Sequence, residues 1–142
     1  MIKNTNIKNS IKHVINRFAQ PSRLYASNGT TLKQLLHTGD TYQNTPADGD
    51  RIQMFFMCDG TETKFELGTE KHTTRGIFDL YVNGILDSSG YDDYAAGSTD
   101  SFRDITLTEP IVKGSNMVEL RINGKNASST NYLIYHRGSS LQ

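Results

Sequence analysis

The stretch from Asp87 to Tyr94, with the sequence DSSGYDDY, concentrates the side chains of this chain that are best suited to binding chemistry. It carries three carboxylates, two serine hydroxyls and two tyrosines in eight residues. Carboxylates and backbone carbonyls are the oxygen ligands that calcium prefers, whereas a tyrosine ring beside polar side chains suits a sugar ring. We therefore identify a candidate ligand or interface loop, whose members are Asp87, Tyr91, Asp92, Asp93 and Tyr94.

Three interpretations of this loop stay open: a sugar site, a calcium site, and a solvated or interface loop. Its spacing does not match the twelve-residue calcium loop, which ends on a glutamate. Two carboxylates that flank a sugar can hydrolyse it, but Asp92 and Asp93 are adjacent in sequence and are expected to point apart. We therefore predict no catalytic residue here and assign no metal ligands.

The remaining nucleophiles and metal ligands are scattered along the chain. No two of the four histidines lie close together in the sequence. The single cysteine, Cys58, ends the apolar run 52–58, which predicts a buried, unreactive thiol. No zinc-protease helix, nucleophile elbow or phosphate loop is present. The sequence therefore predicts a protein that is not an enzyme and that needs no cofactor.

The net charge of zero at pH 7 hides two halves of opposite sign. The first 39 residues contain six basic residues and no acidic one, whereas the chain from Asp40 onward contains 9 basic and 15 acidic residues. This asymmetry indicates a basic arm attached to an acidic domain. Nucleic acid is not expected as a partner, because the arm has one aromatic residue and offers no platform for stacking bases. No apolar run is long enough to span a membrane.

Residues 1–24 are predicted to form the arm, with helical character over residues 9–19 and an end at Pro21. Apolar residues recur along it at a helical spacing and would bury themselves against a neighbouring surface. These anchors are Ile7, Ile11, Ile15 and Phe18, and the basic residues among them are Lys8, Lys12 and Arg17. We expect the arm to dock on another copy of the chain or on a larger assembly, which predicts a homo-oligomer.

Beyond residue 50 the chain has the pattern of short β-strands separated by turns. Apolar or alternating runs cover residues 52–58, 64–67, 77–82, 102–108, 117–122 and 132–135, and Leu141 completes the series. Three turn dipeptides of the kind that joins β-hairpins divide these runs, namely Asp59-Gly60, Asn83-Gly84 and Asn123-Gly124. The pattern predicts an all-β fold, a jelly-roll-type β-sandwich over residues 25–142 with an extended, partly helical N-terminal arm.

The second half of the chain carries a family likeness in residues 76–84, 102–108 and 114–126. These segments resemble β-sandwich jelly rolls of the galactose-binding-like kind. They are even more similar to the accessory β-domains of tailed-phage virion proteins, which are capsid decoration, head-fibre, and tail or baseplate components. The resemblance implies a small structural virion protein whose arm fastens it to the shell, with the major capsid protein as its partner.

Two functions from different classes follow from these observations. The first is a capsid decoration (cement) protein located in the virion, which oligomerises and anchors to the shell through its N-terminal arm. The alternative is a glycan-binding module of a tail or fibre protein used in host attachment. Tyr91, Asp92, Asp93 and Tyr94 beside the 83–84 turn motivate the alternative.

Overall fold

A computed structural model describes residues 23–26, 32–34, 41–43 and 46–142, the first three segments by their backbone alone. The predicted arm anchors Ile7, Ile11, Ile15 and Phe18, and their basic neighbours Lys8, Lys12 and Arg17, lie outside the described residues. The described strands are β1 Arg23–Ala26, β2 Leu32–Gln34, β3 Thr41–Gln43, β4 Arg51–Cys58, β5 Lys64–Lys71, β6 Ile77–Val82, β7 Ile85–Asp92, β8 Thr99–Thr106, β9 Gly114–Ile122 and β10 Tyr135–Leu141.

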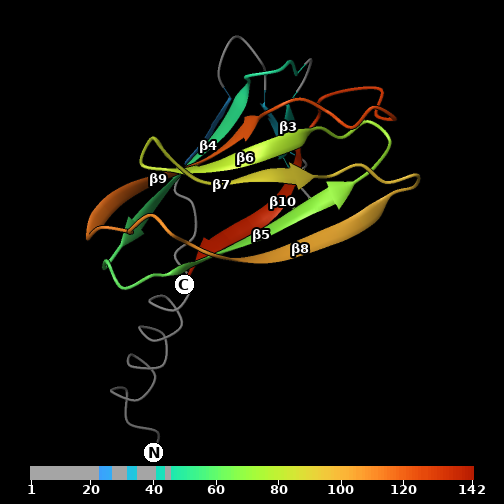
Figure 1. The fold of residues 1–142 in the computed structure, drawn as a ribbon. Coiled ribbons are helices and arrows are strands. Elements are labelled where there is room, and N and C mark those ends of the chain that lie inside the picture. Colours follow the sequence, from blue (N-terminus) through green and yellow to red (C-terminus); the bar gives the residue numbers. More distant parts are fainter. Residues whose placement is uncertain (1–22, 27–31, 35–40, 44–45) are drawn as a thin grey trace, which may run out of the picture.

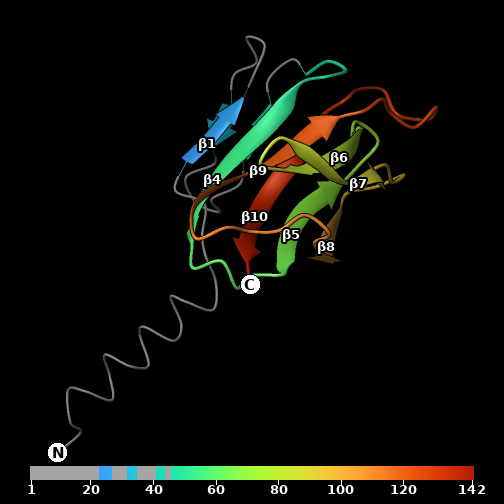
Figure 2. The ribbon, with the colours of Figure 1, turned by 60° about the vertical axis from the view of Figure 1, so that its left-hand side comes forward.

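The strands form two antiparallel sheets of five, which confirms the predicted all-β sandwich. One sheet has the order β1-β4-β9-β6-β7 and the other the order β2-β3-β10-β5-β8. The two sheets lie face to face as the layers of a sandwich (Figure 1, Figure 2). The chain crosses repeatedly from one sheet to the other, as between β4 and β5, in the manner of a jelly roll. Among the described residues there is no helix of the length and apolarity that crossing a membrane requires.

The core lies between the two sheets and follows from the period of two along each strand. Ile52, Met54 and Phe56 of β4 alternate with more exposed residues and are fully buried. The ring of Phe56 meets that of Phe65 in the opposite sheet edge to face, with centroids 6.1 Å apart. Other buried apolar side chains come from both sheets: Leu67, Phe78, Leu80, Val82, Ile105, Val118, Leu120, Ile122, Ile134 and Leu141.

Of the three predicted hairpin turns, only the one at Asn83 and Gly84 joins two paired strands. Asn83 has φ +49° and Gly84 φ +85°, the left-handed conformations that a tight two-residue hairpin requires at both positions. The turns after β4 and β9 lead instead to strands of the opposite sheet. The hairpin expectation was wrong there, because a turn dipeptide favours a reversal of the chain but does not decide which layer the next strand joins.

The predicted loop over residues 87–94 is largely a strand, because β7 runs from Ile85 to Asp92. β7 is an edge strand, so much of it faces solvent and its sequence lacks the apolar alternation of a buried strand. Gly90 has φ +80°, and the pairing of β6 with β7 shifts register twice. These irregularities remove the periodic signal that marks a strand.

β1 begins at Arg23 and pairs with β4, so the paired structure starts two residues before the predicted domain boundary at residue 25.

The role of the residues that precede β1 stays a prediction. We expect that removing residues 1–22, which leaves β1 intact, converts a discrete oligomer into a monomer. Light scattering of both proteins at low and high salt measures this change. An unchanged mass would contradict the assembly role of the arm.

Candidate functional site

The carboxylate of Asp87 holds the two sheets together at one edge. Its Oδ1 accepts hydrogen bonds from the backbone N–H of Thr108 at 2.7 Å and from that of Glu109 at 2.8 Å. The Thr108 hydroxyl lies 3.2 Å from the same oxygen. Since Asp87 is in β7 and Thr108 follows β8, the bonds connect edge strands of opposite sheets. This predicted ligand residue is therefore engaged within the fold.

The carboxylates of Asp92 and Asp93 bind different partners. Asp92 accepts one hydrogen bond from the backbone N–H of Tyr94 and another from the side-chain amide of Asn126, both at 2.8 Å. Asp93 is completely buried and forms an ion pair with Arg103 of β8. The two carboxylates therefore point to different parts of the fold, as the sequence analysis expected. Neither is arranged to flank a substrate.

The ion pair between Asp93 and Arg103 lies against two aromatic rings. Tyr91 stacks on Phe78 with ring centroids 5.4 Å apart, and the Arg103 guanidinium lies 5.5 Å from the Phe78 centroid and 5.7 Å from that of Tyr91. The Tyr91 hydroxyl donates to Ser88 Oγ at 2.8 Å. Burial raises the pKa of Asp93, and the Arg103 charge opposes that rise. The side chains of Tyr91 and Asp93 are therefore engaged in contacts within the fold.

A calcium ion does not fit the carboxylates of the 87–94 stretch. Asp87, Asp92 and Asp93 hold separate parts of the fold through the bonds given above. Within residues 46–142 no group of three or more His, Cys, Asp or Glu side chains could hold a metal ion. Tyr94 is half-buried, and its backbone N–H donates to the Asp92 carboxylate.

We predict that Arg103→Met lowers the free energy of unfolding at neutral pH by about 3–5 kcal/mol, because it leaves the Asp93 charge buried without a partner. The folded state raises the pKa of Asp93 above its ordinary value of 3.8, so low pH favours folding at this group. The deficit of the variant should therefore shrink as the pH falls. Urea denaturation of the variant and the parent at neutral and acidic pH measures both effects.

The matched control for Arg103→Met is Lys64→Met, which removes a cation from the exposed pair that Lys64 forms with Asp104 at 3.2 Å. Its cost should stay below about 1 kcal/mol. Equal deficits for the two variants would contradict the structural importance of the buried pair.

The Cys58 thiol is held in its protonated form. Burial and the nearby carboxylate of Glu62 raise its pKa to about 11, against a smaller opposing effect of a hydrogen bond with Asn116. A thiol attacks only as the thiolate, so this residue is a poor nucleophile at neutral pH. The structure therefore agrees with the expectation of an unreactive cysteine, although the side chain is half-buried rather than buried.

We expect iodoacetamide to label Cys58 in the folded protein at about pH 8 more slowly than in urea, by about one to two orders of magnitude, because folding lowers the thiolate fraction. Mass spectrometry of the labelled chain over time measures both rates. Raising the pH should narrow the difference as the folded thiol ionises. Equal rates in the folded and unfolded protein would contradict the raised pKa.

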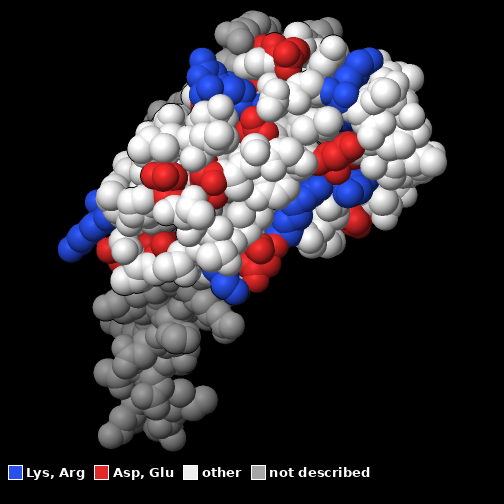
Figure 3. Space-filling model, viewed as in Figure 1, with Lys and Arg blue, Asp and Glu red and all other residues white. Residues whose placement is uncertain are grey.

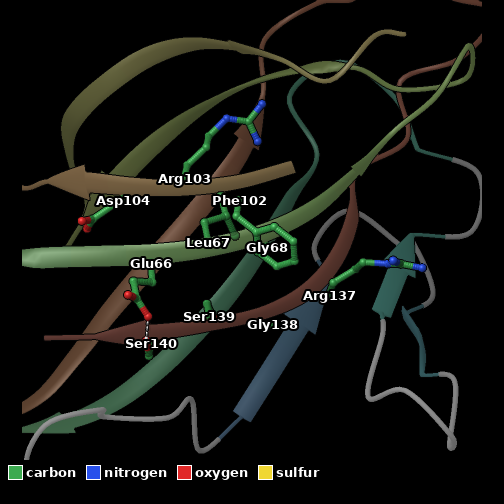
Figure 4. A pocket seen from close by; sticks show the side chains of 10 residues that line it. All are labelled: Glu66, Leu67, Gly68, Phe102, Arg103, Asp104, Arg137, Gly138, Ser139 and Ser140. Carbon is green, nitrogen blue, oxygen red and sulfur yellow. Dashed lines mark hydrogen bonds between the residues drawn. The ribbon is translucent and has the colours of Figure 1, made fainter. Parts of the chain in front are cut away.

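A hollow of the described surface lies on the outer face of the second sheet, over β5, β8 and β10. Its volume is about 410 Å³. Ten residues line it: Glu66, Leu67, Gly68, Phe102, Arg103, Asp104, Arg137, Gly138, Ser139 and Ser140. Figure 4 shows these residues on three neighbouring strands. The hollow is therefore built on a rigid sheet rather than on loops.

Phe102 presents an aromatic ring at the centre of the hollow. Its side chain is 79% exposed, the highest value among the large apolar residues described. The ring lies over Gly68, its direct partner on β5, and a methyl group added at position 68 would come within 3.2 Å of it. Gly138 of β10 pairs with Gly68 on the other side. The two glycines leave a flat floor around the ring.

An aromatic ring that covers a glycine on a neighbouring strand is also a way to pack a sheet. Here, however, most of the ring surface stays in contact with solvent. A solvent-facing ring inside a hollow with polar walls is the arrangement that stacks against a flat ligand. The exposure of Phe102 therefore favours a binding role over a packing role.

The walls of the hollow carry hydrogen-bonding groups at both ends. At one end Glu66 accepts a hydrogen bond from Ser140 Oγ at 3.1 Å. At the other end Arg137 pairs with Asp100 and lies 3.6 Å from Glu70. Acidic and basic side chains are interspersed over the face of the molecule that Figure 3 shows, rather than gathered by sign.

The sequence analysis missed Phe102 as a functional residue, although its strand carried a usable signal. In the run 102–108 the buried residue is Ile105, and Phe102 stands an odd number of positions away from it. Phe102 must then face outward, since side chains alternate between the two faces of a strand. An aromatic residue at an outward position of a well-defined strand is the signal that would have identified the site.

Comparison with solved structures finds a similar fold in proteins that include carbohydrate-binding modules. The chain is similar to the carbohydrate-binding module CBM36 in complex with calcium and xylotriose, with a TM-score of 0.60 and 12% identity over 88% of this chain and 98% of that one. It is also similar to the CBM36-1 domain of a multidomain xylanase from the hindgut metagenome of Trinervitermes trinervoides, with a TM-score of 0.61 and 14% identity over 88% of this chain and 94% of that one.

A third similar structure is a Paenibacillus xanthan lyase, with a TM-score of 0.59 and 20% identity over 87% of this chain but 13% of the lyase. Neither a protein-family model nor a characterised protein sequence matches the chain. At these identities the likeness shows the fold alone, which is a jelly-roll-type β-sandwich.

Proposed function

We propose that this domain binds glycans without catalysis, through the hollow on the outer face of β5, β8 and β10. The observation that carries the proposal is Phe102, whose ring is 79% exposed over Gly68 at the centre of that hollow. The likeness in fold to two carbohydrate-binding modules supports the proposal, since the alignment covers nearly the whole length of each module.

The chemistry of the hollow suits a pyranose ring. The apolar C–H face of a sugar stacks on the exposed aromatic face of Phe102, and its edge carries hydroxyls that need hydrogen-bond partners. Glu66 and Asp104 provide acceptors beside the ring, and Ser140 provides a hydroxyl. In ligand sites an apolar or aromatic surface provides most of the contact area, and a few polar groups at its edge fix the orientation of the ligand. The hollow has both features.

The positions of Glu66 and Asp104 favour binding over hydrolysis. The two residues are direct cross-strand partners on one face of the sheet. They therefore approach a bound sugar from the same side, whereas the two carboxylates of a glycosidase flank the scissile bond. Asp104 is in addition paired with Lys64 at 3.2 Å.

The virion location, the capsid partners and the homo-oligomer stay predictions from the sequence, because the described residues and the comparisons leave them untested. The glycan-binding proposal corresponds to the alternative that the sequence analysis gave for a tail or fibre protein. The proposed site differs, however, because we propose the sheet face around Phe102 in place of the 87–94 stretch.

We predict that Phe102→Ala weakens glycan binding about tenfold or more, because it removes the stacking surface. The change should leave the thermal midpoint nearly unaltered, since the side chain is mostly exposed. Affinity electrophoresis against a panel of soluble neutral, cationic and anionic polysaccharides, followed by calorimetry with the best ligand, measures the loss. Met57→Ala is the control, because Met57 is 67% exposed and lies outside the hollow. Binding that Phe102→Ala does not change would contradict the proposal.

A further inference from the structure

Two acidic residues occupy neighbouring positions on adjacent strands beside the Phe102 ring. Glu66 of β5 and Asp104 of β8 are direct cross-strand partners on the outer face of the sheet. Like charges at such positions destabilise a strand pair. Both residues lie two positions along their strands, and so on the same face, from the pair formed by Gly68 and Phe102. The Cα atoms of the acidic pair are therefore about 7 Å along the strands from those of Gly68 and Phe102.

The cations near the hollow leave this acidic pair undercompensated. Lys64 pairs with Asp104, but no ion pair of Glu66 occurs among the described residues, and its bond is to the Ser140 hydroxyl. Arg103 turns inward to Asp93, and Arg137 pairs with Asp100 and lies close to Glu70. Figure 4 shows the side chains of Arg103 and Arg137 extending away from Glu66. One end of the hollow is therefore net acidic.

We propose that the glycan bound here is one that contains amino sugars, with a protonated amine seated against Glu66 and Asp104. This inference rests on the proposed glycan-binding function and adds the ligand class. A sugar ring stacked on Phe102 directs a ring substituent toward the carboxylates, and an ammonium group supplies three donors for them. The same cation is attracted by the face of the aromatic ring.

The charge pattern also works against other sugars. A uronic acid would bring a third carboxylate to Glu66 and Asp104, and like charges brought together at an interface oppose binding. An N-acetylated sugar keeps the ring but loses the charge of the amine. The site should therefore favour glucosamine oligosaccharides over N-acetylglucosamine oligosaccharides of the same length, and should reject oligogalacturonate.

The test measures the affinities of the full chain for four oligosaccharides of equal length by calorimetry, at about pH 6, where sugar amines are protonated. The probes are oligomers of glucosamine, N-acetylglucosamine, glucose and galacturonate. We expect glucosamine to bind about tenfold or more tightly than the two neutral oligomers, and the preference to decline with added salt. Glu66→Gln should reduce glucosamine affinity about five- to tenfold and reduce the affinity for neutral oligomers by less, because glutamine loses the charge but keeps one acceptor oxygen.

The matched control is Glu109→Gln, which removes the same charge at a residue that does not line the hollow. A loss of glucosamine affinity equal to that of Glu66→Gln would mean general attraction to an acidic domain and would overturn the inference. Neutral oligomers that bind as well as glucosamine and need Phe102 would overturn the amino-sugar preference alone. The proposed function itself would be overturned if none of the oligomers bound, or if Phe102→Ala left their affinities unchanged.

Discussion

The buried ion pair between Asp93 and Arg103 determines which way β8 faces. Asp93 follows the edge strand of one sheet, and Arg103 lies on the edge strand of the other, so the pair connects the two layers of the sandwich. Burying the charge of Asp93 is costly unless a cation lies beside it. The side chain of Arg103 must therefore point inward, toward Asp93. The residues on either side of Arg103 must then point outward. Phe102 and Asp104 reach the outer face for this reason.

The glycines opposite Phe102 complete the platform. A side chain at position 68 of β5 would press against the Phe102 ring. Gly138 is the partner of Gly68 on β10 and adds no side chain next to it. Glycine in a strand weakens that strand, because it adds flexibility and packs nothing. The face therefore combines three features that each cost stability: two strand glycines, an exposed aromatic ring, and the opposed carboxylates of Glu66 and Asp104. Their coincidence in one hollow is best explained by a ligand.

The sequence predicted the strands whose apolar residues form a run or alternate, and it missed β7 and most of β10. Runs such as 52–58 and 77–82 are rich in apolar residues because they pack in the core, and the structure confirms them as β4 and β6. β7 lies at an edge and carries register shifts, so no periodicity marked it. The carboxylates of the 87–94 stretch were interpreted as ligands because their true partners, such as Thr108 and Asn126, are 21 and 34 residues away. Composition alone reveals donors and acceptors but not which of them meet.

The position of β8 at the edge of its sheet bears on how copies of the domain meet one another. An edge strand exposes unpaired backbone groups that can recruit the edge of a second molecule and extend the sheet. Asp100 and Asp104 stand exposed along this edge, so two copies that approach through it bring carboxylates together. Asp104, which we propose as part of the ligand site, is thus also one of the charged residues that disfavour pairing of β8 with a second copy.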